Sequence, residues 1–167
     1  MSMIEFTKKC GLMVACFSVL GSQVAAQDIS SQNPEGVADL LRERGQTAIV
    51  TVDEFNDPFI ETSAGNADYN IIFYGCQAHK SCTSFSLRAQ RMSNGSASFE
   101  AMNTWNTEQR WTKLYTADIH SAILEMDFLF AQGPMDEPVF NAYLDIWDQS
   151  LREFVRYIDE GEYDFVE

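Results

Sequence analysis

The sequence is poor in cations and contains no basic cluster. Eleven Lys and Arg residues stand against 25 Asp and Glu residues, which gives a formal net charge of −14. Nucleic-acid affinity depends on Lys and Arg side chains that displace counterions from phosphates. We therefore expect no nucleic-acid partner, and the charge is more typical of a soluble protein than of one that binds membrane surfaces.

Groups suited to catalysis are also scarce. The histidines are His79 and His120, and neither lies in a G-x-S-x-G or similar motif. Nucleophilic catalysis requires a base beside a Ser, Thr or Cys, so we expect no catalytic residue and no cofactor. The alternative is a small metal-dependent or hydrolytic enzyme that uses His79 or His120 with nearby acids. Glu125 and Asp127 could act as paired carboxylates, although such pairs arise by chance in an acidic chain.

No apolar run reaches the roughly 20 residues of a membrane-spanning helix. The run from Gly11 to Leu20 follows two lysines and precedes Val24-Ala25-Ala26, which is the pattern of a cleavable signal peptide. We expect cleavage after Ala26, no membrane span after that cleavage, and a periplasmic or secreted mature chain. An uncleaved anchor and a lipoprotein modified at Cys16 are the alternatives, but the residues before Cys16 make a poor lipobox.

Cysteine is nearly absent from the expected mature chain. Removal of residues 1–26 leaves only Cys76 and Cys82, which should pair in an oxidising compartment. Their spacing predicts sulfurs on facing strands across a hairpin. His79 between them makes a zinc site with one further acid an alternative, but structural zinc sites usually have a dedicated ligand pattern, so we favour the disulfide and expect no metal.

What the sequence does contain is enough apolar material for one domain, since 46% of the 167 residues are hydrophobic. The periodicity predicts the order α-β-β-β-β-α-β-β-α. This order is typical of an α+β fold with an antiparallel sheet of about six strands and helices on one face. We expect a signal peptide at 1–26, a flexible lead-in at 27–33, the domain at 34–160 and an acidic tail at 161–167.

The helix signals are local. Asn33-Pro34-Glu35 combines a cap with a first-turn proline, Ser98 caps a short second helix, and Asp136-Glu137-Pro138 opens the longest one. That last helix carries apolar residues at a 3.6-residue period, so it should cover the sheet. The clearest strands are expected at 69–76, 82–92, 111–116 and 121–130, where the pattern is continuously apolar or alternates.

One polar and aromatic group could form a binding surface. Trp105, Asn106, Arg110 and Trp111 are residue types that bury partner surface while keeping a polar group available. The alternative is structural: Trp105 in the core, Asn106 capping the short helix, and Arg110 paired with an acid.

These features together resemble the YbjN family of bacterial proteins. The resemblance rests on the apolar strand that ends in Tyr74-Gly75-Cys76, on Cys82 opening an alternating strand, on Asn103-Thr104-Trp105-Asn106 followed by Arg110-Trp111, and on the long C-terminal helix. It spans roughly residues 34–160. It implies a fold similar to the small chaperones of type III secretion, and a role as a sensory transduction regulator with no named biochemical activity.

We therefore expect a non-enzymatic exported binding or chaperone-like protein that regulates or assists envelope processes. Its partner would be a protein or peptide, with a homodimer as one arrangement. A purely structural accessory of the envelope, without a soluble ligand, is a further alternative.

Overall fold

The computed structural model describes residues 29–93, 98–118 and 120–160, which form three helices and six strands. In chain order they are α1 Pro34–Glu43, β1 Thr47–Val52, β2 Pro58–Ala64, β3 Ala67–Tyr74, β4 Ser84–Met92, α2 Phe99–Glu108, β5 Lys113–Asp118, β6 Ser121–Leu129 and α3 Glu137–Glu160. The α+β class and the order of elements confirm the prediction. The expected signal peptide at 1–26 and the acidic tail at 161–167 lie outside the described residues.

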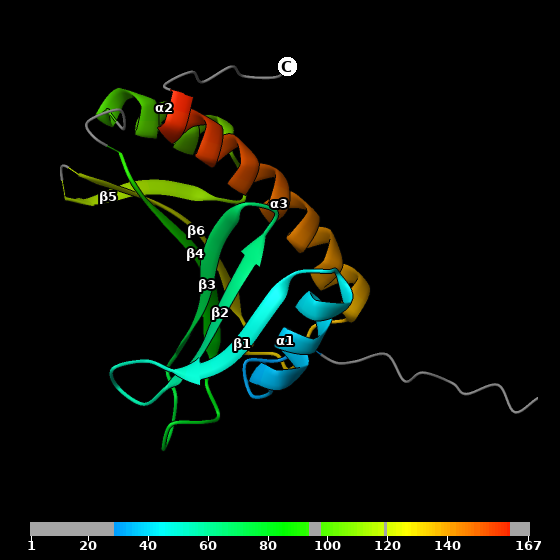
Figure 1. Ribbon diagram of the computed structural model, residues 1–167. Coiled ribbons are helices and arrows are strands. Elements are labelled where there is room, and N and C mark those ends of the chain that lie inside the picture. Colours follow the sequence, from blue (N-terminus) through cyan, green and yellow to red (C-terminus); the bar gives the residue numbers. More distant parts are fainter. Residues whose placement is uncertain (1–28, 94–97, 119, 161–167) are drawn as a thin grey trace, which may run out of the picture.

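The strands form one antiparallel sheet in the order β1-β2-β3-β4-β6-β5. Since side chains alternate along each strand, one face carries the core, for example Phe73, Phe85 and Phe128 at paired positions. The other face carries Ser86 and Asp127. Figure 1 shows α1 and α3 along the same side of the twisted sheet, with α2 near the C-terminal part of α3. We call the opposite side the open face.

Phe85 lies at the centre of the core. Its ring is fully buried, and its centroid lies 4.9 to 5.8 Å from those of four other phenylalanines. These neighbours come from β3, β6, the segment after β6, and α3: Phe73, Phe128, Phe130 and Phe140. Six buried apolar residues of α3 belong to the predicted stripe, namely Phe140, Leu144, Trp147, Leu151, Phe154 and Ile158. Tyr157 is buried although the period did not predict it, and the predicted Tyr143 and Val155 are only partly buried.

Both shorter helices begin where the sequence predicts. The Asn33 side chain accepts a hydrogen bond from the Gly36 N–H at 3.1 Å, and Pro34 occupies the first helical turn. The Ser98 hydroxyl accepts from the Ala101 N–H at 3.1 Å. Gly45 follows the C-terminal cap of α1 and has a φ of +79°, a backbone conformation that favours glycine.

Residues 29–33 differ from the flexible lead-in that we expected. Ile29 is fully buried and pairs with Met135, with N–H to O distances of 3.0 and 2.8 Å in the two directions. The buried Ser31 hydroxyl donates to the Cys82 carbonyl. The expectation was wrong here because a single apolar residue in a polar segment gives no periodic signal, yet it seals the core beside the start of α3.

The cysteines also lie elsewhere than expected. Cys76 and Cys82 are joined by a disulfide, but β3 ends at Tyr74 and β4 begins at Ser84. The bond therefore closes the connecting loop instead of joining facing strands. The strand expected at 111–116 likewise begins later, at Lys113, which leaves Trp111 outside the sheet.

Candidate binding surfaces

The structure separates the four residues that we expected to form one surface. Trp105 is fully buried, and its Nε1 donates to the Thr112 hydroxyl at 3.1 Å. A side chain that packs in the core and has its polar atom satisfied inside the protein cannot contact a partner. The prediction that Trp105 binds a partner was therefore wrong, and its structural alternative holds.

Asn106 is engaged with the outer edge of β5. Its Nδ2 donates to the Leu114 carbonyl and its Oδ1 accepts from the Leu114 N–H, both at 2.8 Å. The amide thus occupies the hydrogen-bonding position that a neighbouring strand would take. Asn106 is not the cap of α2, because the Gln109 N–H closes that helix end on the Trp105 carbonyl at 2.7 Å.

Trp111 and Arg110 are exposed and form a pair at the surface. The Trp111 side chain is 47% exposed, and its ring lies edge-on against Tyr143 of α3 with a centroid distance of 5.6 Å. The guanidinium of Arg110 lies 5.2 Å from the Trp111 ring centroid, a cation–π contact. Arg110 therefore lies against one face of this ring, and within residues 29–93, 98–118 and 120–160 it has no acidic partner.

Trp111 lines an apolar groove of about 360 Å³ on the first half of α3. We call it the Trp111 groove, and its other lining residues are Pro138, Val139, Ala142, Tyr143 and Ile146. None of them is charged. This surface was not predicted from the sequence, although a second apolar stripe at positions 139, 142 and 146, beside the core stripe, indicates it.

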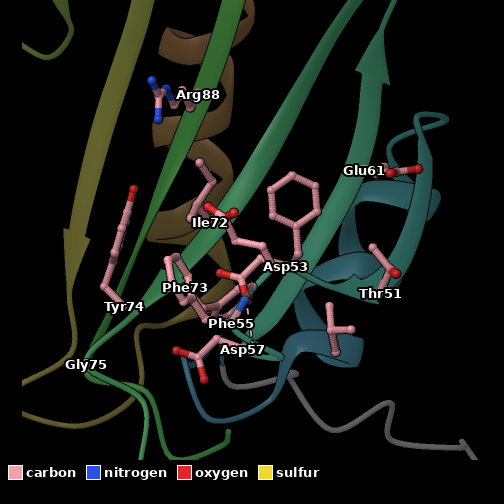
Figure 2. A pocket seen from close by; sticks show the side chains of 13 residues that line it. Thr51, Asp53, Phe55, Asp57, Glu61, Ile72, Phe73, Tyr74, Gly75 and Arg88 are labelled. Atoms are coloured by element: carbon pink, nitrogen blue, oxygen red, sulfur yellow. Dashed lines mark hydrogen bonds between the residues drawn. The ribbon is translucent and has the colours of Figure 1, made fainter.

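A second hollow lies on the open face, over β1 to β4. This open-face groove has a volume of about 620 Å³ and a floor that includes Phe59 and Ile72, which face each other in adjacent strands. Figure 2 shows Arg88 at one end, Tyr74 on one side and Glu61 on the other. It lies on the side of the sheet that lacks helices.

The lower end of the open-face groove is formed by the β1–β2 loop. The Asp53 Oδ1 accepts hydrogen bonds from the N–H groups of Phe55 and Asp57, at 2.8 and 2.9 Å, which fixes the loop. Phe55 remains 69% exposed. His79 Nδ1 lies 3.2 Å from an Asp57 oxygen, so one of the two histidines supports this loop from the β3–β4 connection.

Glu125 and Asp127 belong to a polar network on the open face. The Lys113 ammonium contacts Glu125 at 2.9 Å and Asp127 at 2.8 Å, while Tyr115 donates to Glu125 and Ser86 donates to Asp127. Burial alone would raise the pKa of Asp127, but its hydrogen bonds with Lys113 and Ser86 hold that pKa below its ordinary value. The hydrogen bond with Asp127 raises the pKa of Lys113.

Those partners give the network a structural role. Burial and the hydrogen bond to Glu125 raise the pKa of Tyr115 to about 12, so the phenol stays protonated at neutral pH. Asp127 is ionised, and Lys113 lies against both carboxylates. Asp127 therefore holds no proton to donate at neutral pH, and both carboxylates are already engaged with Lys113 and a hydroxyl donor.

The alternative of a metal-dependent enzyme has little to rest on in the described part of the chain. Cys76 and Cys82 are bonded to each other, and His79 contacts Asp57. His120 is exposed in the β5–β6 turn. Among residues 29–93, 98–118 and 120–160, no three His, Cys, Asp or Glu side chains cluster as metal ligands do, and no helix is both long and apolar enough to cross a membrane.

Comparison with known proteins identifies a family. No curated protein and no solved structure is significantly similar to the chain. The sequence pattern of one family, YbjN, described as "Putative bacterial sensory transduction regulator", matches residues 33–160. The match spans the whole domain from the cap of α1 to the end of α3, so the chain belongs to the YbjN family.

Proposed function

We propose that the mature chain is an exported, non-enzymatic regulator that binds another protein through the Trp111 groove. The family description, "Putative bacterial sensory transduction regulator", supports the role of a regulator. The observation that carries the proposal is a half-exposed tryptophan that lines an uncharged groove in a chain of net charge −14. Tryptophan anchors in apolar pockets with a polar rim are typical of the energetic centres of protein interfaces.

The groove suits an apolar side chain of the partner. Val139 is 47% exposed and lines the groove together with Trp111. Burial of both side chains would remove apolar area from water at roughly 25 cal/mol per Å². Arg110 at the rim would contact the partner's polar groups, as the charged rim of an interface does.

The test combines crosslinking with measured affinity. A photo-crosslinking amino acid at Val139 should capture a partner in cells, and the purified partner should bind Trp111→Ala at least tenfold more weakly than the natural protein, a loss of about 1.4 kcal/mol. Phe99→Ala is the matched control, because Phe99 is exposed on α2 away from the Trp111 groove. Equal affinity of Trp111→Ala and the natural protein would refute the proposal.

Export is the second part of the proposal. It is supported by the two lysines, the apolar run and the Val24-Ala25-Ala26 sequence at the N-terminus. We expect the protein from its natural host to begin at Gln27 and to fractionate with the periplasm or medium, as N-terminal sequencing would establish. Full-length chain in the cytoplasmic fraction would contradict this, and replacement of Lys8 and Lys9 by Glu should cause precursor to accumulate.

A further inference from the structure

The two edges of the sheet are protected very differently. At the β5 edge, Asn106 covers the Leu114 backbone, Lys113 carries a charge, and the strand has a register shift between Tyr115 and Asp118. Lysines, bulges and covering groups are how proteins prevent an edge strand from pairing with another chain. The β5 edge therefore has the usual protection.

The β1 edge has less protection, in the form of one side chain, Arg42, at the Ala48 carbonyl. The sequence of β1, Thr-Ala-Ile-Val-Thr-Val, has no charged residue and no proline, and its register with β2 runs without a shift. Ile49 is 61% exposed and Val52 is 55% exposed. A regular, β-branched and uncharged edge strand is well suited to accept a further strand.

Three contacts show which backbone groups of β1 point outward. Val52 faces Pro58, which has no N–H to donate, and the next residue, Asp53, donates its own N–H to the Asp57 carbonyl at 2.9 Å. In an antiparallel pair, the residues whose backbone groups bond the neighbouring strand alternate with residues whose backbone groups point away from it. The N–H and C=O groups of Ala48, Val50 and Val52 therefore point away from β2. The Arg42 side chain agrees with this, because its Nε donates to the Ala48 carbonyl at 3.0 Å.

The groups at Val50 and Val52 have no such cover. Arg42 occupies only the Ala48 carbonyl, and in the described part of the chain no further hydrogen bond reaches the outward N–H and C=O groups of these two valines. Val50 and Val52 are thus two successive outward-facing residues at which an added strand could form backbone hydrogen bonds. An added strand would satisfy four backbone groups there and cover Val52.

The charges around β1 select the chemistry of that strand. Glu43 precedes β1, Glu54 follows it, and Glu61 faces Ile49 from β2 on the open face. Within the described residues, none of these three carboxylates has an ion-pair partner. Pairing β1 with a second copy would bring the Glu43 and Glu54 ends of two copies together, which like charges oppose.

We propose that the β1 edge binds an extended segment of another protein that is rich in Lys or Arg, which joins the sheet beside β1. Backbone hydrogen bonds to Val50 and Val52 would supply affinity, and the three glutamates would select basic side chains. This inference goes beyond the Trp111 groove and does not depend on it, because the groove lies on α3 and β1 is at a sheet edge.

The test uses a fluorescein-labelled peptide in which lysines flank an alternating Thr-Val core, and a second peptide with Glu in place of each Lys. We expect the basic peptide to bind, with fluorescence anisotropy showing at least tenfold weaker binding to Val52→Pro. Proline removes only an outward N–H at this position, so the fold should survive. Val52→Thr, which keeps the N–H and the β-branch, is the matched control and should bind within about threefold of the natural protein.

Two further measurements keep the outcome interpretable. Amide exchange measured by NMR in the unaltered protein should slow at Val50 and Val52 on peptide binding, with little change at Thr51, which already pairs with Phe59. Trp111→Ala should bind the peptide normally, which separates this proposal from the proposed function. Equal binding of the acidic peptide, unchanged exchange at both valines, or a β1-dependent homodimer in sedimentation would each overturn the proposal.

Discussion

Phe85→Ala is expected to lower the free energy of unfolding by about 3–5 kcal/mol. The ring is fully buried between the sheet and α3 and packs against four other phenylalanine rings. Truncation removes the transfer free energy of the ring and leaves a cavity among rigid aromatic neighbours, which have little room to close it.

Urea unfolding followed by tryptophan fluorescence would measure this loss. Two of the three tryptophans, Trp105 and Trp147, are fully buried, so their emission should report loss of the core. Phe55→Ala is the matched control, because that ring is 69% exposed in the β1–β2 loop and its removal should change stability by less than about 0.5 kcal/mol. A loss below about 1 kcal/mol for Phe85→Ala would contradict the packing described here.

The position of Phe85 in the core could be predicted because its evidence is local. Cys82 to Met92 alternates in polarity, and a half-covered strand places its apolar side chains on one face. The caps of α1 and α2 depend on neighbouring residues in the same way. The fold class followed because each of these local preferences agrees with the others.

The binding surfaces could not be predicted to the same degree, because they depend on where distant segments meet. Trp105 and Trp111 are alike in the sequence, but β5 begins at Lys113 and leaves Trp111 beside α3, whereas Trp105 faces the core. The role of Asn106 depends on the edge position of β5, and strand order is not written in any single segment. Polarity patterns identify faces, but they do not identify edges.

Reduction of the Cys76–Cys82 disulfide is expected to lower the free energy of unfolding by about 2 kcal/mol. A ring closed over a sequence separation of 6 restricts the unfolded chain by roughly 2–3 kcal/mol in the chain-entropy account. Part of this stabilisation is offset by strain in the native loop, where Ala78, His79 and Ser81 have φ values of 51°, 60° and 51°. Such left-handed conformations are unfavourable for residues other than glycine, and the reduced loop can leave them.

The comparison needs only the natural protein, refolded with and without dithiothreitol, and urea unfolding of both forms. The Cys76→Ala/Cys82→Ala variant is the control, since dithiothreitol should not change its unfolding curve. Because His79 contacts Asp57, release of the loop should also speed amide exchange in the β1–β2 loop at the end of the open-face groove. Coincident unfolding curves for the oxidised and reduced protein would show that the core alone holds this end of the sheet, and the disulfide would then have no bearing on the groove.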